Sequence, residues 1–376
     1  MPTALIFSPH ADDVAAFCGG TIARFSAEGW QTILVRVTDD CRDSVGLSVE
    51  ETRKVNAAEL RDAAAILGIS EIIELDYETD RLADVPEIEL REKFVYLIRK
   101  HQPYAVFSFD PDGLQENNQD HIKVAAAVDE SLWVSAFDKH YPDHFTEGLK
   151  PWSVVERWFF ARKLAEPNYA MDVSEFMEKR IRAMCAHQHM LKHMLRQYQM
   201  QLEAWGRRVP WVDEAYEGDH TELVATFLQE GANAVAKEFK LGEGRMGEVF
   251  RLVRFGDLEG LFQGMSVPIE GANSIPVRAG LDLPPGAETW PAAQLEQIFP
   301  ADIDRRIRLM GHHHLCTGAF EELVASTPFR LSYANLVEKV RPHPELEIES
   351  IYGYDIFCYQ CGYWSEEEGR CGTGWK

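Results

Sequence analysis

Basic residues are scarce in this sequence, since 38 lysines and arginines stand against 61 aspartates and glutamates, a formal net charge of −23. There is also no apolar run near the roughly 20 residues of a membrane helix, and no basic segment leading into an apolar one at the start. The excess of negative charge argues against surfaces built for nucleic acid or anionic lipid, which need basic patches. We therefore expect a cytoplasmic protein without nucleic-acid or membrane partners that acts on a small neutral or cationic ligand. The number of chains that assemble is left open.

The cysteine count is odd, which excludes a complete set of intramolecular disulfides among the seven thiols. Four of them crowd the C-terminal part of the chain, at Cys316, Cys358, Cys361 and Cys371. Thiolates at such spacing suit a structural zinc or an iron–sulfur cluster. Reduced, partly buried thiols are the alternative. We predict a second metal centre here and leave its metal open.

The first twenty residues carry the motif around which the chain is organised. Ala4 to Phe7 is a short apolar run of the kind that forms a buried parallel strand, and it stops at a serine and a proline. His10, Asp12 and Asp13 come directly after it, ahead of a predicted helix. An imidazole and two carboxylates on one tight turn suit a divalent metal with a catalytic base beside it. The alternative is a capping cluster, because aspartates also stabilise helix N-termini.

Strand-like and helix-like stretches alternate over the first 140 residues. This order predicts an α/β fold with a doubly wound, Rossmann-like parallel sheet and right-handed crossovers. The predicted strands are 4–7, 32–37, 72–75, 105–109 and 154–161, and the predicted helices are 50–67, 87–101, 122–137 and a long one over 174–205. We expect three regions: a catalytic domain over 1–205, an insertion or lid over 206–300, and a cysteine-rich module over 301–376.

A second polar loop follows the fourth strand and ends in Asp120-His121. In a doubly wound sheet such loops gather at the carboxyl edge, so His121 can meet His10 and Asp13. Two histidines and an aspartate make a zinc site with an open position for water, as catalytic zinc sites have. Asp12 is then free to act as general base, and Asp120 could hold a ligand imidazole in its tautomer.

The two loops resemble a known family. Pro9-His-Ala-Asp-Asp13 resembles the His-Pro-Asp-Asp signature of the PIG-L/LmbE de-N-acetylases, and Asn118-Gln-Asp-His121 resembles their second signature, His-Pro-Asp-His. The resemblance covers about residues 1–205. It implies a zinc-dependent hydrolase that removes an acyl group, with acetyl expected, from an N-acylated amino sugar or related small amine. By position it makes His10, Asp13 and His121 the zinc ligands and Asp12 the general base.

Three departures from the family pattern bear on the chemistry. Ala11 replaces a proline and affects the stiffness of the turn alone. Asn118 replaces a histidine that helps to stabilise the oxyanion, and an asparagine N–H can donate a hydrogen bond there but cannot supply a proton. The block Lys179–Gln188 is a weakened form of a further family motif. We therefore expect Asp12 to carry the proton alone, or another residue to take the missing role.

Two further interpretations stay open. His189 and His193 lie four residues apart on a predicted helix, as ligands can, but no carboxylate stands at a matching offset and a polar helix face is favoured. Other functions are also open: a redox protein whose C-terminal cysteines carry the chemistry, or a binding module that keeps the metal and has lost turnover.

Overall fold

The computed structural model describes residues 2–259, 262, 265–267, 269–270, 364–365 and 370–371. The chain divides into two compact units, Met1–Arg254 and Phe255–Lys376. In the second unit the described elements are η3 (Gly256–Leu258) and an antiparallel pair, β8 (Trp364–Ser365) with β9 (Arg370–Cys371). Cys316, Cys358 and Cys361 and the side chain of Cys371 lie outside the described part, so the second metal centre stays a prediction.

A seven-stranded sheet in the order β3-β2-β1-β4-β5-β7-β6 runs through the first unit. Five neighbouring strands are parallel: β1 (Thr3–Ser8), β2 (Gln31–Thr38), β3 (Glu71–Tyr77), β4 (Ala105–Phe109) and β5 (Glu156–Phe160). The predicted doubly wound parallel sheet is confirmed for these five. Two strands that were not predicted from the sequence extend the sheet: β7 (Gly247–Val253) pairs antiparallel with β5, and β6 (Tyr169–Asp172) pairs antiparallel with β7.

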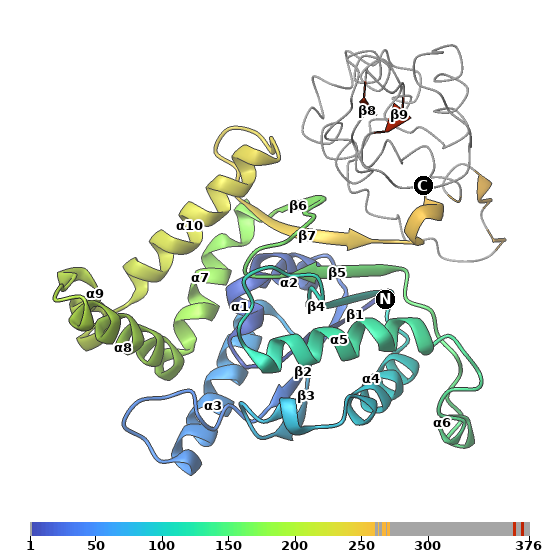
Figure 1. Ribbon diagram of the computed structural model, residues 1–376, viewed down its shortest axis with the longest axis horizontal. Helices are drawn as coiled ribbons and strands as arrows, with labels where there is room; N and C mark the ends of the chain where they lie inside the picture. Colours follow the sequence, from blue (N-terminus) through green and yellow to red (C-terminus); the bar gives the residue numbers. More distant parts are fainter. Residues whose placement is uncertain are drawn as a thin grey trace. The chain divides into compact units, whose positions relative to one another are not determined.

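Helices cover both faces of this sheet (Figure 1). Along β1, Ala4 and Ile6 point into one apolar cluster, while Leu5 and Phe7 point into the other. Burial on both sides explains why the strand is apolar throughout. The first cluster contains residues of α1 (Asp13–Phe17), α2 (Gly19–Ala27), α3 (Val49–Leu67), α7 (Met177–Ala186) and α10 (Thr221–Glu238), and the second those of α4 (Glu87–His101) and α5 (Gln119–Val134).

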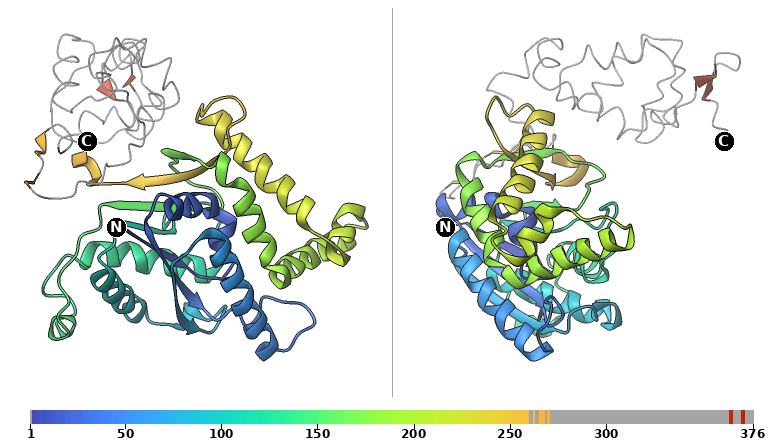
Figure 2. Two further views of the ribbon diagram at one scale, coloured as in Figure 1. Left: turned by 180° about the vertical axis from the view of Figure 1, so that it is seen from behind. Right: turned by 90° about the vertical axis from the view of Figure 1, so that its left-hand side faces the viewer.

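The single helix predicted over 174–205 is wrong. A short η2 (Ser174–Phe176) leads into α7, and the chain then bends at His187 before α8 (Gln188–Ala204). The backbone of His187 has ψ of 60°, outside the helical region, and so ends α7. From α8 the chain continues through α9 (Pro210–Glu217) to α10, and these helices lie together beside α7 (Figure 2). The remaining short helices are η1 (Leu82–Asp84) and α6 (Asp143–Thr146).

Residues 206–254 are integrated into the first unit, so the expected boundary at residue 205 falls between two of its helices. β7 pairs with β5, and from β7 the buried Glu248 accepts hydrogen bonds from the backbone N–H groups of Gly20 (2.8 Å) and Thr21 (2.7 Å). Arg180 of α7 lies 3.1 Å from the same carboxylate. A side chain at Gly20 would meet Val173 at 2.8 Å, which explains a glycine at this position. None of the described helices has both the length and the apolar content to cross a bilayer.

Candidate metal centre

The loop after β1 holds the first three site residues in a tight turn. It is anchored where the Pro9 carbonyl accepts a hydrogen bond from the Thr38 N–H (3.0 Å) and where Ala11 donates its N–H to Asp40 (3.1 Å). Within the turn, the His10 N–H donates to Asp13 Oδ2 at 2.8 Å. Asp12 is the N-cap residue of α1, but its side chain makes no capping hydrogen bond. This counts against a purely capping role for the acidic pair.

The second loop places its residues through the start of α5. Asn118 is the N-cap, and its side-chain oxygen accepts the Asp120 N–H at 2.8 Å. The helix therefore begins three residues earlier than the sequence predicted, and its first turn carries Asp120 and His121. Both are buried, at 0% and 3% exposed. An N-cap that fixes the first turn also fixes the direction in which His121 leaves the helix.

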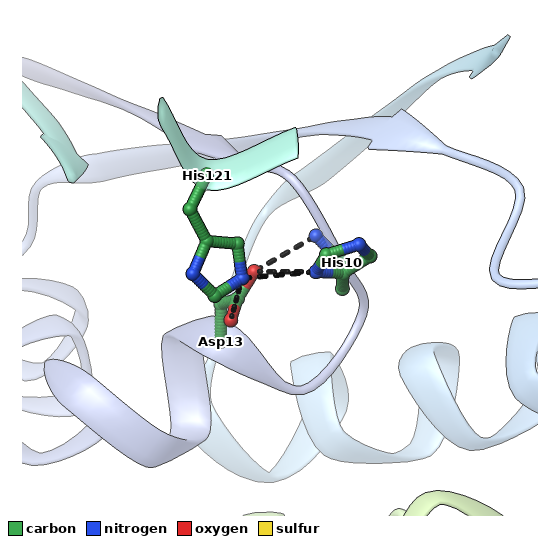
Figure 3. Close-up of side chains that lie close together, drawn as sticks. All are labelled: His10, Asp13 and His121. Atoms are coloured by element: carbon green, nitrogen blue, oxygen red, sulfur yellow. Dashed lines mark hydrogen bonds and ion pairs between the residues drawn. The ribbon is translucent and has the colours of Figure 1, made fainter. Parts of the chain in front are cut away.

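His10, Asp13 and His121 converge on one point, with their ligand atoms all within 4.8 Å of one another. Figure 3 shows the three side chains directed toward each other. His10 Nδ1 lies 3.1 Å from His121 Nε2 and 3.5 Å from Asp13 Oδ2, and His121 Nε2 lies 3.3 Å from Asp13 Oδ1. Among the described residues this is the one such group of potential ligands. The spatial meeting predicted from the sequence is thus present.

Each imidazole also contacts a carboxylate on its far side. His10 Nε2 lies 3.3 Å from Asp120 Oδ2, as expected for a residue that holds a tautomer. His121 Nδ1 lies 2.9 Å from Glu116 Oε2, a partner that was not predicted from the sequence. The second loop contains several acids at similar spacing, Asp110 and Asp112 among them, so the sequence alone does not single out Glu116.

Charges within the cluster shift its titration strongly. Burial opposes protonation of His121, but the Asp13 carboxylate and the hydrogen bonds to Asp13 and Glu116 raise the pKa of His121 to about 9. The pKa of His10 is also raised, against its burial, by Asp120 and Asp13. Both histidines in turn hold the pKa of Asp13 well below its ordinary value, despite burial. In the metal-free site the positive charge is therefore carried by protons on His10 and His121.

The donor set and its spacing fit a zinc ion. Two imidazoles and one carboxylate are ligands that zinc takes in catalytic sites, and three protein ligands leave it one short of its usual four. Bonds of about 2.0–2.1 Å to tetrahedral ligands separate the donor atoms by roughly 3.3 Å. His10 Nδ1 and His121 Nε2 lie 3.1 Å apart, and they lie 3.5 and 3.3 Å from different oxygens of Asp13, Oδ2 and Oδ1. The donor types and their closeness therefore suit the metal.

Asp12 is adjacent to the ligand Asp13 and is partly exposed. Burial of its carboxyl group and the charge of Asp13 raise the pKa of Asp12 to about 7. A general base works best when its pKa lies near the working pH. In the metal-free protein the pKa of Asp12 thus lies in the range that favours proton transfer.

The helix histidines do not join the cluster. His189 Nδ1 lies 2.6 Å from Glu59 Oε1, and His193 Nδ1 lies 3.3 Å from the Ser44 carbonyl. His187 is buried at the bend between α7 and α8, and burial lowers its pKa to about 4, so it is neutral. None of the three belongs to the metal-ligating group found in the described residues.

Comparison with known proteins agrees with this geometry. The profile of the GlcNAc-PI de-N-acetylase family (PIG-L) matches residues 5–132, which contain all three candidate ligands. The chain is similar to diacetylchitobiose deacetylase of Thermococcus kodakarensis, at 28% identity over 186 residues, which is 49% of this chain and 68% of that protein.

Solved structures extend the likeness. The N,N'-diacetylchitobiose deacetylase from Pyrococcus horikoshii aligns with a TM-score of 0.54 and 26% identity, over 70% of this chain and 86% of that one. GalB, the 4-carboxy-2-hydroxymuconate hydratase from Pseudomonas putida, aligns with a TM-score of 0.50 over 67% of this chain and 96% of its own. At 17% identity the likeness to GalB shows the fold alone.

Proposed function

Residues 5–132 of this chain are a PIG-L family domain, and we propose that the chain is a metal-dependent N-deacetylase that removes the acetyl group from an N-acetylated sugar. The named relatives deacetylate diacetylchitobiose, which supports a small N-acetylated sugar as the substrate class. We infer zinc as the metal, because its donor preferences match the cluster.

The meeting of His10, Asp13 and His121 carries this proposal. Their ligand atoms come from two loops more than a hundred residues apart and lie within 4.8 Å of one another. Bound there, a zinc ion polarises an acyl carbonyl and lowers the pKa of water to roughly 7. The protein's part is to hold the two imidazoles and the Asp13 carboxylate in place, with Asp120 behind His10.

Asp12 handles the proton in the proposed reaction. It takes a proton from the attacking water, whose oxygen bonds to the acyl carbon. The carbon–nitrogen bond then breaks, and Asp12 passes the proton to the amine nitrogen, so that acetate and the free amine leave. In the metal-free protein the pKa of Asp12 is raised to about 7, and a carboxyl group that titrates near the working pH can act first as base and then as acid.

Asn118 is the proposed donor to the oxyanion. Its side-chain oxygen is engaged in capping α5, which leaves the amide N–H₂ as the group with protons to offer. An amide donor stabilises negative charge but does not titrate, so the proton must come from Asp12. Asn118 thus takes part of the role of the histidine in the second signature of the family.

Product analysis tests the proposal. Zinc-loaded protein is incubated with N-acetylglucosamine and diacetylchitobiose, and acetate and free amine are measured. We expect both products in equal amounts. Asp12→Asn should lower kcat by about 100-fold or more and keep its zinc, whereas the exposed Asp84→Asn should match the parent.

Other outcomes would contradict the proposal. Full activity in Asp12→Asn would show that Asp12 is not the general base. No product from any N-acetylated sugar at full zinc occupancy would favour the alternative of a binding module that keeps the metal and has lost turnover.

The remaining expectations rest on the sequence. We propose a second metal, zinc or an iron–sulfur cluster, held by Cys316, Cys358, Cys361 and Cys371. We also propose a substrate-facing role for the part of the expected lid region that belongs to the first unit, residues 206–254. The net charge of −23 supports a protein without nucleic-acid or anionic-membrane partners, and we propose that it is cytoplasmic.

A further inference from the structure

Glu116 lies behind His121, on the side of the ring away from the other ligands. Its Oε2 is 2.9 Å from His121 Nδ1, whereas His121 Nε2 is the atom that faces His10 and Asp13. The side chains are 8% and 3% exposed, so water competes little for this contact. A carboxylate in this position fixes the ring tautomer and increases the basicity of the other nitrogen.

The surrounding backbone fixes Glu116 in turn. Its Oε1 accepts the Asn118 N–H at 2.9 Å, and Arg162 Nε lies 3.3 Å from Oε2. Arg162 follows β5, and the neighbouring Lys163 accepts the Leu114 N–H on its carbonyl at 2.8 Å. This bridge ties the loop after β4 to the segment after β5 and brings Arg162 to Glu116.

The face of the His121 ring is held as well. The Phe109 ring stacks on it with centroids 4.0 Å apart and planes inclined by 25°. Stacking limits tilt of the imidazole, and the hydrogen bond to Glu116 limits its rotation. Together the contacts direct Nε2 at the ligand cluster.

We propose that Glu116, fastened by Arg162, is a positioning residue that keeps the proton on His121 Nδ1 and thereby sets the zinc affinity of the site. The proposal rests on the metal site proposed above. Arg162, Glu116 and His121 then form one chain of contacts that leads to the metal site. The chain begins at the surface, where the Arg162 side chain is 53% exposed. Loss of a carboxylate behind a ligand histidine typically weakens metal binding by about 10–100-fold.

The chain offers a matched control. Glu59 Oε1 lies 2.6 Å from His189 Nδ1, the same type of pair, but His189 is not in the ligand cluster. We would measure zinc dissociation constants by chelator competition for the parent, Glu116→Ala, Glu116→Gln and Glu59→Gln. We expect affinity about 10–100-fold weaker in Glu116→Ala, a smaller loss in Glu116→Gln, and no change in Glu59→Gln. In the cobalt-substituted protein, the visible spectrum should shift in the Glu116 variants alone.

Arg162→Gln tests the rest of the chain of contacts. It should weaken zinc binding several-fold in the parent and leave affinity unchanged in a Glu116→Ala background, because Arg162 acts through Glu116. Equal losses in both backgrounds would overturn that part. Parent-like affinity in Glu116→Ala would overturn the whole proposal, and if that variant does not fold, parent-like affinity in Glu116→Gln does the same. The readout is metal binding, so an enzyme inactive on every N-acetylated sugar would refute the proposed function without touching this inference.

Discussion

His10 Nε2 and Asp120 Oδ2 lie 3.3 Å apart, and the two residues are only 7% and 0% exposed. The same carboxylate accepts the Asp80 N–H at 2.7 Å and the Leu82 N–H at 3.1 Å. Asp120 therefore joins the loops that follow β1, β3 and β4 at one edge of the sheet. The orientation of a ligand from the first loop depends on an acid in another and on backbone in a third.

Replacement of Asp120 by alanine should lower both stability and metal affinity. The buried Leu82 N–H and the part-buried Asp80 N–H would lose a charged acceptor, which costs about 1.5–3 kcal/mol per hydrogen bond, and His10 would lose its partner. We expect chemical denaturation of the metal-free protein to show a loss of at least about 2 kcal/mol. Chelator competition should show zinc binding about 10–100-fold weaker. An unchanged free energy of unfolding would contradict this account of Asp120.

The stability of the metal-free protein should fall as the pH rises. The pKa of His121 is about 9 when folded, against 6.5 ordinarily, so the folded state binds more protons between these values. The stabilisation from this group is complete below pH 6.5 and is lost as the pH passes through 9. Thermal unfolding of chelator-treated protein from pH 6.5 to 9 measures this slope.

Zinc should abolish that dependence. A metal-bound imidazole carries no proton on the nitrogen that binds the metal, so zinc uptake must release protons that His10 and His121 hold. The zinc-loaded protein should therefore keep its melting temperature over the same pH range. In metal-free His121→Gln the slope should be reduced, and a slope equal to the parent's would assign it to other groups.

Glu248 should be essential to the first unit although it lies far from the ligands in sequence. Its carboxylate holds the start of α2 and pairs with the buried Arg180. Glu248→Ala would leave that guanidinium buried without its partner, at a cost of about 3–5 kcal/mol. Urea unfolding should show this loss, whereas the exposed Glu243→Gln should unfold like the parent. Parent-like stability of Glu248→Ala would contradict a stabilising role for this carboxylate.

Variants of the C-terminal cysteines distinguish the proposed hydrolase from the alternative of a redox protein. Replacement of Cys358 and Cys361 by serine should remove one metal equivalent and leave acetate release intact, because the proposed chemistry belongs to the first unit. Metal analysis and the acetate assay on the same preparation measure both. Lost function in this variant, with Asp12→Ala unaffected, would support the redox alternative.

Local pattern was sufficient to predict the parallel strands and the meeting of the ligands. The apolar run Ala4 to Phe7 ends at a proline, and loops that follow parallel strands gather at one edge, so His10 and His121 could be brought together from the sequence. The resemblance to the two family signatures named the same residues. These inferences needed no knowledge of side-chain contacts.

Contacts between distant segments account for the features that were not predicted. Glu116 is one of several acids in a polar loop, and its contact with Arg162 depends on the bridge from Leu114 to Lys163, which pattern alone does not reveal. The strand β7 lies in a stretch that glycines interrupt, so the sequence pattern did not predict it. Its position in the sheet depends on pairing with β5. The bend at His187 interrupts a sequence with good helical periodicity throughout. In each case tertiary packing decided between local alternatives.

Metal analysis of the purified parent beside His121→Ala tests the central claim most directly, with His189→Ala as the control histidine variant. If residues from the first and second loops bind one ion, His121→Ala should contain one zinc equivalent less than the parent, and His189→Ala should contain the same amount as the parent. Equal zinc content in the parent and His121→Ala, both folded, would contradict the shared metal site and the hydrolase that depends on it.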